Sequence, residues 1–260
     1  MAAVRLDVVR GAASGIGTGS IGLGLKRSVD LAVGIFLTAI ALPLMALIAL
    51  AIRIDSPGPA LYRPRRLGRA GTIFSMYKFR TMVQGAEHRL KDVAHLNVAS
   101  GMVKIPNDPR VTRVGKWLRR FSLDELPQLI NVVAGDMSLV GPRPHDVHEL
   151  AGFDVESDLR LAMRPGLTGL WQITARTDPS YERRMNLDRN YVTHWSLLAD
   201  LKILASTVPV VLKGQGGTVT RQAATEIVRI GVGSGELESH LVSADAIQAI
   251  SGWALPEPNE

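Results

Sequence analysis

One long apolar segment near the N-terminus dominates the hydrophobic pattern of the chain. Leu31–Ile52, LAVGIFLTAIALPLMALIALAI, contains 22 residues and no charge, and about 20 such residues are typical of a helix in a bilayer. A buried helix of a globular protein rarely stays apolar on every side over this length, and the apolar region of a secretory signal is shorter, about 7 to 15 residues. The pattern therefore predicts a membrane helix.

Pro43 divides this segment, and proline removes one backbone hydrogen bond and clashes with the preceding turn. At about 1.5 Å per residue, the arms Asp30–Leu42 and Pro43–Arg53 are each shorter than a hydrocarbon core of about 30 Å. Basic residues flank both ends, with Lys26 before and Arg53 at the end, as expected when both ends stay in the cytoplasm. The pattern favours a re-entrant helix-break-helix, with a kinked helix that spans the bilayer as the alternative.

Shorter patterns follow the apolar segment. Ser56–Met82 alternates apolar and polar residues between turn signals, which predicts a small β-hairpin. Helical periodicity covers Glu87–Leu96, Val114–Phe121 and Leu187–Leu212. We expect an α+β protein that is mainly α.

The positive charge of the chain is concentrated in one block. The 260 residues are 46% hydrophobic, with a net charge of +6, but Leu61–Arg120 holds 14 Lys and Arg residues against three acidic residues. Such a block favours an anionic partner. Aromatic residues make up 5% of the chain and do not interleave with the block, so we expect no nucleic-acid partner. The absence of cysteine suits a cytosolic face.

A glycine-rich stretch before the apolar segment matches a dinucleotide-binding pattern, Gly17-x-Gly19-x-x-Gly22. This fingerprint requires a preceding strand and a βαβ unit, whereas here the membrane segment follows. A soluble dehydrogenase is therefore an unfavourable alternative, and we interpret the stretch as part of a flexible leader.

Two adjacent carboxylates, Asp124 and Glu125, follow dense positive charge in RRFSLDELPQL. Ser122 and Glu125 fit a helix-capping box, although Pro127 is tolerated better in the first turn if the helix begins at Asp124. Either start places Asp124 near a helix N-terminus, where we expect it to stay ionised at neutral pH. An ionised carboxylate can attack phosphorus or bind a divalent cation, so capping and chemistry both remain open.

Basic and polar residues elsewhere could hold phosphate groups. Lys78 and Arg80 would share one face of an extended segment. Arg143 lies in the rigid loop Gly141–Pro144 and can grip a phosphate with two hydrogen bonds. The turn-rich stretch Met163–Arg176 adds polar candidates, Arg164, Gln172 and Arg176.

Four ordered motifs resemble the bacterial sugar transferase family, the monotopic phosphoglycosyl transferases that begin surface-polysaccharide assembly. They are MYKFRTM, SLDELPQLINVVAGDMSLVGPRP, RPGLTGLWQ and LDRNYV. The resemblance implies a monotopic membrane protein of the bacterial inner membrane, with interfacial helices and a compact catalytic domain on the cytoplasmic face. It suggests a leader over 1–25, a re-entrant helix over 26–54, a catalytic domain over 55–213 and a C-terminal extension of unknown role over 214–260.

The resemblance also implies a reaction. A sugar 1-phosphate, usually of a hexose, passes from a UDP-sugar to undecaprenyl phosphate, and UMP is released. By resemblance, Asp124 attacks the β-phosphate to form a covalent phosphosugar, and Glu125 holds Mg2+. Further motif positions are expected near phosphate or nucleotide: Lys78, Arg80, Arg143, Gln172, Arg176 and Asp188. A catalytically silent membrane scaffold is the alternative, and the apolar helices leave room for a homodimer.

Overall fold

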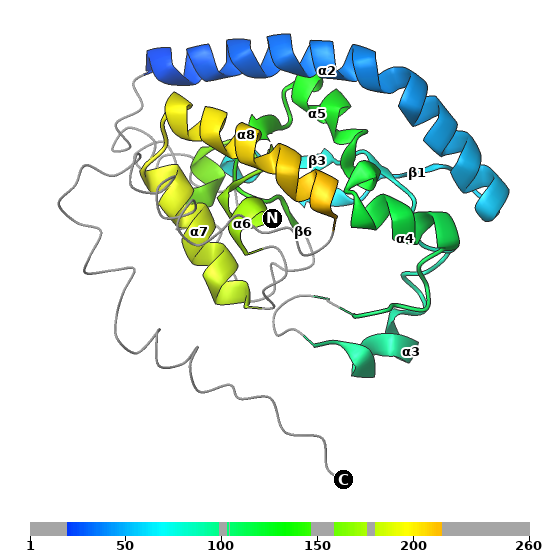
Figure 1. The fold of residues 1–260 in the computed structure, drawn as a ribbon. Helices are drawn as coiled ribbons and strands as arrows, with labels where there is room; N and C mark the ends of the chain where they lie inside the picture. The colour runs from blue at the N-terminus through cyan, green and yellow to red at the C-terminus, as the bar shows by residue number, and fades with distance from the viewer. Residues whose placement is uncertain (1–19, 99–102, 104, 147–158, 176–179, 215–260) are drawn as a thin grey trace.

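The structure is a computed structural model that describes residues 20–98, 103, 105–146, 159–175 and 180–214. Helices and short strands alternate along the chain, so the expected mainly helical α+β architecture is confirmed (Figure 1). The α-helices are α2 Ser20–Asp55, α3 Leu90–Val93, α4 Arg113–Arg120, α5 Gln128–Ala134, α6 Leu170–Thr174, α7 Tyr181–Thr193 and α8 Leu197–Lys213. The 3-10 turns are η1 Arg69–Gly71, η2 Ala94–Leu96, η3 Leu123–Glu125 and η5 Leu159–Ala162. The strands are β1 Leu61–Tyr62, β2 Arg65–Leu67, β3 Ile73–Ser75, β4 Lys78–Phe79, β5 Ser138–Val140, β6 His145–Asp146 and β7 Gly166–Thr168.

The strands form three small sheets. The predicted hairpin over Ser56–Met82 is confirmed as two nested antiparallel pairs, β2 with β3 and β1 with β4. β6 adds to the other edge of β2, so the chain after the Arg143 loop returns to the hairpin. β5 and β7 pair in parallel, and at the end of this pair Gly141 and Gly166 approach so closely that a Cβ on Gly166 would lie 2.1 Å from the Gly141 nitrogen.

Helix α2 is continuous, so the predicted break at Pro43 is wrong. The helix begins at Ser20, before the predicted start at Lys26, and runs through Pro43 to Asp55. Figure 1 shows it as the long blue helix that curves across one side of the molecule. Ala41 and Met45 flank the proline and pack into the interior. Because these neighbouring turns are held against the body, the lost hydrogen bond leads to curvature and not to a break.

The outer face of α2 is apolar and its inner face carries buried charges. Lys26 Nζ donates to the Val140 carbonyl at 2.9 Å and to Asp200 at 2.6 Å, and Asp30 accepts from Ser138 at 2.7 Å. The outward side chains include large exposed apolar residues: Ile35, Phe36, Ile40, Leu42, Leu44, Leu47, Leu50 and Ile54. Within the described part of the chain, only Gly22–Asp55 is long and apolar enough to cross a membrane.

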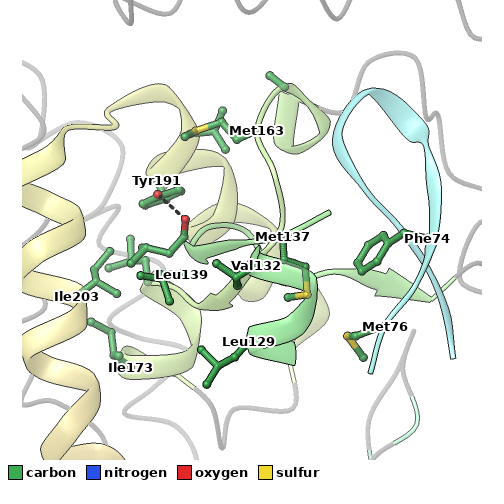
Figure 2. Packing of buried hydrophobic residues seen from close by; sticks show 14 residues of the cluster. Phe74, Met76, Leu129, Val132, Met137, Leu139, Met163, Ile173, Tyr191 and Ile203 are labelled. Atoms are coloured by element: carbon green, nitrogen blue, oxygen red, sulfur yellow. Dashed lines mark hydrogen bonds between the residues drawn. The ribbon is translucent and has the colours of Figure 1, made fainter. Parts of the chain in front are cut away.

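Two apolar clusters hold the body together. The larger joins β3, α5, β5 and α6 to α7 and α8, and Figure 2 shows Val132 and Met137 near its middle and Ile173 towards Ile203. Its dashed line marks the Tyr191 hydroxyl, which donates to the Val140 carbonyl at 3.1 Å. The smaller cluster packs the C-terminal half of α2 on β1, β4, α4 and η3.

The predicted helix over Val114–Phe121 is confirmed as α4, with Thr112 as its N-cap. The single helix predicted over Leu187–Leu212 is wrong, because α7 ends at Thr193 and α8 starts at Leu197. Ser196 caps α8 by accepting from the Ala199 N–H, and this cap signal lies within the predicted helix. The helix predicted over Glu87–Leu96 is reduced to α3 and η2.

Candidate active site

The turn η3 places Asp124 and Glu125 side by side on the inner surface of the body. Leu123 and Leu126, on either side of the pair, pack against the smaller apolar cluster beneath α2. This packing fixes the turn, and it leaves Asp124 2% exposed and Glu125 9% exposed. The carboxylates therefore lie in a largely water-excluded position close to the long apolar helix.

The structure does not contain the capping box proposed for Ser122. Ser122 adopts a left-handed conformation, with φ 57°, and its side chain makes no capping hydrogen bond to η3. Helix α5 begins at Gln128, with Pro127 as its N-cap and φ −62°. Proline is tolerated at this boundary because no intrahelical N–H is required there. The Ser122 side-chain bond that defines a capping box is therefore absent at η3.

Lys78 reaches the carboxylate pair from β4. Its Nζ lies 2.8 Å from Asp124 Oδ2 and 3.4 Å from Glu125 Oε1. Asn131, which is fully buried on α5, fixes the segment that leads into β4. Its side chain accepts from the Tyr77 N–H at 2.8 Å and donates to the Ser75 carbonyl at 2.9 Å. The strand that carries Lys78 is thus tied to the helix that follows the carboxylates.

A second positive charge comes from α4. Arg119 is half-buried and its Nε donates to Thr81 Oγ1 at 2.9 Å. Burial lowers the pKa of Arg119 from its ordinary value, and the nearby negative charge of Asp124 partly offsets this effect. Arg119 therefore adds to the positive potential around Asp124.

Arg80 follows β4 but points elsewhere. Its guanidinium donates to the carbonyls of Pro57 and Ser56, the latter at 2.8 Å, where the chain leaves α2. The structure therefore does not bring Arg80 to the carboxylates, and the phosphate cradle expected from Lys78 and Arg80 together is not formed. The guanidinium anchors the backbone at the end of α2.

Arg143 approaches the carboxylates from the loop between β5 and β6. Its Nη1 lies 3.6 Å from Glu125 Oε1, and its Cζ lies 5.6 Å from the centroid of the Trp171 ring. Arg184 Cζ lies 5.5 Å from the same centroid. The indole of Trp171 thus contacts two guanidinium groups beside the site.

Asp188 and Gln172 lie behind this loop, on α7 and α6. Asp188 is completely buried, and burial raises its pKa to about 7, although the neighbouring arginines, led by Arg184 and Arg160, act in the opposite direction. Asp188 Oδ2 accepts from the Arg143 N–H at 3.2 Å. Among the described residues, Asp188 Oδ1 and both side-chain amide atoms of Gln172 are buried without a hydrogen-bond partner, which is unusual for polar atoms in a folded protein.

The structure thus joins most of the predicted site residues. Asp124, Glu125, Lys78 and Arg143 are in mutual reach, and Asp188 contacts the loop that carries Arg143. Arg176 lies outside the described residues. Sequence reasoning missed Arg119, Asn131 and Trp171 as parts of the site. Arg119 lies in a helix that was predicted from periodicity alone, which does not show what its side chains contact. Likewise, no local motif shows that a buried asparagine bridges a strand to a helix.

The arrangement is compatible with a magnesium ion that the protein holds only in part. The described residues contain no group of three or more His, Cys, Asp or Glu side chains that could form a complete metal cage. Mg2+ often binds through one or two carboxylates and completes its shell with water and substrate phosphates. The adjacent carboxylates of Asp124 and Glu125 fit this mode.

Comparison with known proteins agrees with the motifs. The sequence model of the family described as bacterial sugar transferase matches residues 21–214. The undecaprenyl-phosphate galactose phosphotransferase of Salmonella typhimurium is 44% identical over 197 residues, which cover 74% of this chain and 41% of that protein. The exopolysaccharide production protein ExoY of Sinorhizobium fredii is 43% identical over 196 residues, covering 74% of this chain and 87% of that protein.

A third relative carries a more specific name. The UDP-glucose:undecaprenyl-phosphate glucose-1-phosphate transferase of Caulobacter vibrioides is 44% identical over 195 residues, which cover 72% of this chain and 69% of that protein. The matched segment contains α2 from Ile21 onward and every residue of the candidate site that the structure describes. The match thus confirms the resemblance seen in the motifs and the expectation of a sugar-phosphate transferase enzyme. Since the matched residues include both the long apolar helix and the carboxylate pair, this chain belongs to the bacterial sugar transferase family.

Proposed function

We propose that the protein transfers a sugar 1-phosphate from a UDP-sugar to undecaprenyl phosphate, with release of UMP, as the first membrane step of exopolysaccharide synthesis. The central observation is the ion pair between Lys78 and Asp124, at 2.8 Å, with Glu125 and Arg143 beside it. Relatives named for undecaprenyl-phosphate sugar transfer support the substrate classes.

The proposed chemistry has two halves. In the first, an oxygen of Asp124 bonds to the β-phosphorus of the donor, and the bond from that phosphorus to the bridging oxygen breaks, so that UMP leaves with the electron pair. In the second, a phosphate oxygen of undecaprenyl phosphate attacks the same phosphorus and restores the Asp124 carboxylate. This two-step scheme is nucleophilic catalysis, and the 2% exposure of Asp124 limits the access of water to the intermediate.

Each neighbouring group has a proposed task. Lys78 orients the Asp124 carboxylate and offsets its charge, so that a phosphate anion can approach. Arg143 binds a phosphate oxygen, and Gln172 offers an unpartnered amide to a polar group of the donor. Glu125 would hold Mg2+, which when bound supplies charge neutralisation to the diphosphate.

The contacts of α2 support a helix that enters one leaflet from the cytoplasmic face of the inner membrane. Asp30 near its start binds Ser138, and Ile52 near its end is 2% exposed in the smaller cluster. A helix that lies along one side of the body over this length is poorly placed to cross a bilayer. Its apolar outer face, with the 62% exposed Trp117 on α4, suits lipid contact instead.

Covalent labelling tests the proposal. Purified protein in lipid nanodiscs, mixed with UDP-sugar labelled with 32P in the β-phosphate and without lipid acceptor, should retain label, and Asp124→Asn should not. Adding undecaprenyl phosphate should release the label into lipid. Label on the Asp124→Asn protein would exclude Asp124 as the nucleophile.

A panel of UDP-sugars, read as UMP release in the presence of Mg2+ and undecaprenyl phosphate, tests the substrate class. A catalytically silent scaffold would release no UMP from any donor, and would show no difference between the parent and Asp124→Asn. The same panel would identify the sugar. Glu125→Gln should raise the Mg2+ concentration needed for half-maximal release if Glu125 holds the ion.

A further inference from the structure

The loop that carries Arg143 has an unusual supply of backbone donors. Arg143 lies between Pro142 and Pro144, and proline has no N–H. The Arg143 N–H is therefore the sole backbone donor between those of Gly141 and His145. The acceptor of this N–H therefore fixes the backbone between the two prolines, and with it the position of the Arg143 guanidinium.

The two sides of the loop are fixed by backbone contacts. Gly141 donates to the Thr168 carbonyl at 2.9 Å, and the Pro142 carbonyl accepts from Gly166 at 2.8 Å. On the other side, His145 pairs with Leu67 in the sheet of β2 and β6. Arg143 itself is held at 3.2 Å by Asp188 Oδ2, on α7.

Asp188 is completely buried, and its Oδ2 already accepts from the Arg143 N–H. Its charged surroundings come from three elements: Arg184 on α7, Arg160 on η5 and Arg143 on the loop. Its second oxygen has no partner in the described part of the chain. An unpaired buried oxygen lowers stability. A role in positioning another group therefore explains a carboxylate at this place better than packing does.

We propose that Asp188 is a positioning residue, which holds Arg143 through the main-chain N–H so that the guanidinium stays between Trp171 and Glu125. This inference rests on the proposed function, because Arg143 is taken as the phosphate-binding group. Asp188 acts through Arg143, because its Oδ2 accepts from the Arg143 N–H.

Hydrogen exchange of the Arg143 N–H tests the positioning step without any substrate. Because both neighbours are prolines, a peptide cut near this loop reports on that amide with little overlap. At a pH well above the pKa of about 7, where Asp188 is ionised, Asp188→Ala should accelerate its exchange about 10- to 100-fold, the range expected for a lost hydrogen bond to a charged acceptor. Asp188→Asn, which keeps an acceptor oxygen, should stay close to the parent. Asp108→Ala removes another buried carboxylate, which binds Arg110, and should leave the Arg143 amide unchanged.

A double-mutant cycle tests the link to function, read as UMP release. If Asp188 acts through Arg143, the double variant Asp188→Ala with Arg143→Ala should be no slower than Arg143→Ala alone. Losses that multiply would overturn the inference, as would unchanged exchange of the Arg143 amide in Asp188→Ala. Failure of the proposed function gives a different result, namely a parent protein that releases no UMP while Asp188→Ala still accelerates the exchange.

Discussion

At the scale of single residues, Lys78 and Arg80 show how two nearby basic side chains take different tasks. Lys78 contacts both carboxylates, whereas the Arg80 guanidinium is used by the carbonyls at the end of α2. A motif that contains both residues suggests one shared phosphate site. The short strand β4 ends at Phe79, so Arg80 no longer follows the alternation that would place it beside Lys78.

Lys78→Met should therefore affect chemistry more than folding. We expect UMP release to fall about 10- to 100-fold, since a hydrogen bond to a charged group contributes about 1.5–3 kcal/mol. Arg80→Met is the matched control, and it should lower the melting temperature while it keeps a larger share of the activity per folded molecule. Equal losses of activity in the two folded variants would contradict this division.

Asp188 should make the stability of the protein depend on pH. Burial raises its pKa from 3.8 to about 7, so the folded state binds this proton more tightly than the unfolded state. The stability due to the proton is complete below pH 3.8 and is lost as the pH rises towards 7. The Asp188→Asn side chain cannot ionise. The free energy of unfolding of this variant minus that of the parent should therefore increase as the pH rises from 3.8 to 7. Denaturant unfolding in detergent at a series of pH values measures the difference, and a constant difference would contradict the raised pKa.

At the scale of elements, the pairing of β5 with β7 supports the Arg143 loop through a backbone contact that only glycine permits. A Cβ on Gly166 would lie 2.1 Å from the Gly141 nitrogen and 2.3 Å from the Thr168 carbonyl. These atoms are backbone, and so they have little freedom to move away.

Gly166→Ala should lower the free energy of unfolding by about 3 kcal/mol or more, because the parallel pair must separate to admit the methyl group. Gly24→Ala provides the same chemical change in α2, where a Cβ would meet nothing within 4 Å. It should be neutral or stabilising, by up to about 1 kcal/mol, because alanine favours helix over glycine. Thermal unfolding of the two variants makes the comparison, and similar melting temperatures would contradict it.

The elements also show which features can be read from sequence. The apolar segment, the hairpin and α4 follow from local periodicity, and the motifs identify Asp124, Glu125, Lys78 and Arg143. The continuity of α2 through Pro43 does not follow from local rules, because it depends on packing against residues far along the chain. Likewise, the left-handed Ser122 replaces the capping box, because the turn is held by Leu123 and Leu126.

At the scale of the whole molecule, α2 has the reverse of the usual polarity of a surface helix. Its charged Lys26 and Asp30 are buried against the body, while its exposed face is apolar. Lys26 joins β5 to Asp200 on α8. The single hydrogen of the Tyr191 hydroxyl is shared between the Val140 carbonyl and Asp200 Oδ1, which lies 2.7 Å away. This buried network ties the start of α2 firmly to the body. The orientation of α2 in a membrane therefore also sets the orientation of the body.

Cysteine accessibility can determine that position, because the chain has no cysteine of its own. Ser28→Cys and Ser56→Cys would place one thiol near the start of α2 and one just after its end. If α2 lies in one leaflet with both of its ends on the cytoplasmic side, both thiols should react with a membrane-impermeant maleimide in inside-out vesicles, and neither should react in right-side-out vesicles. Reaction of both variants in detergent is the control for reactivity. A helix that spans the bilayer would instead expose the two thiols on opposite sides of the membrane.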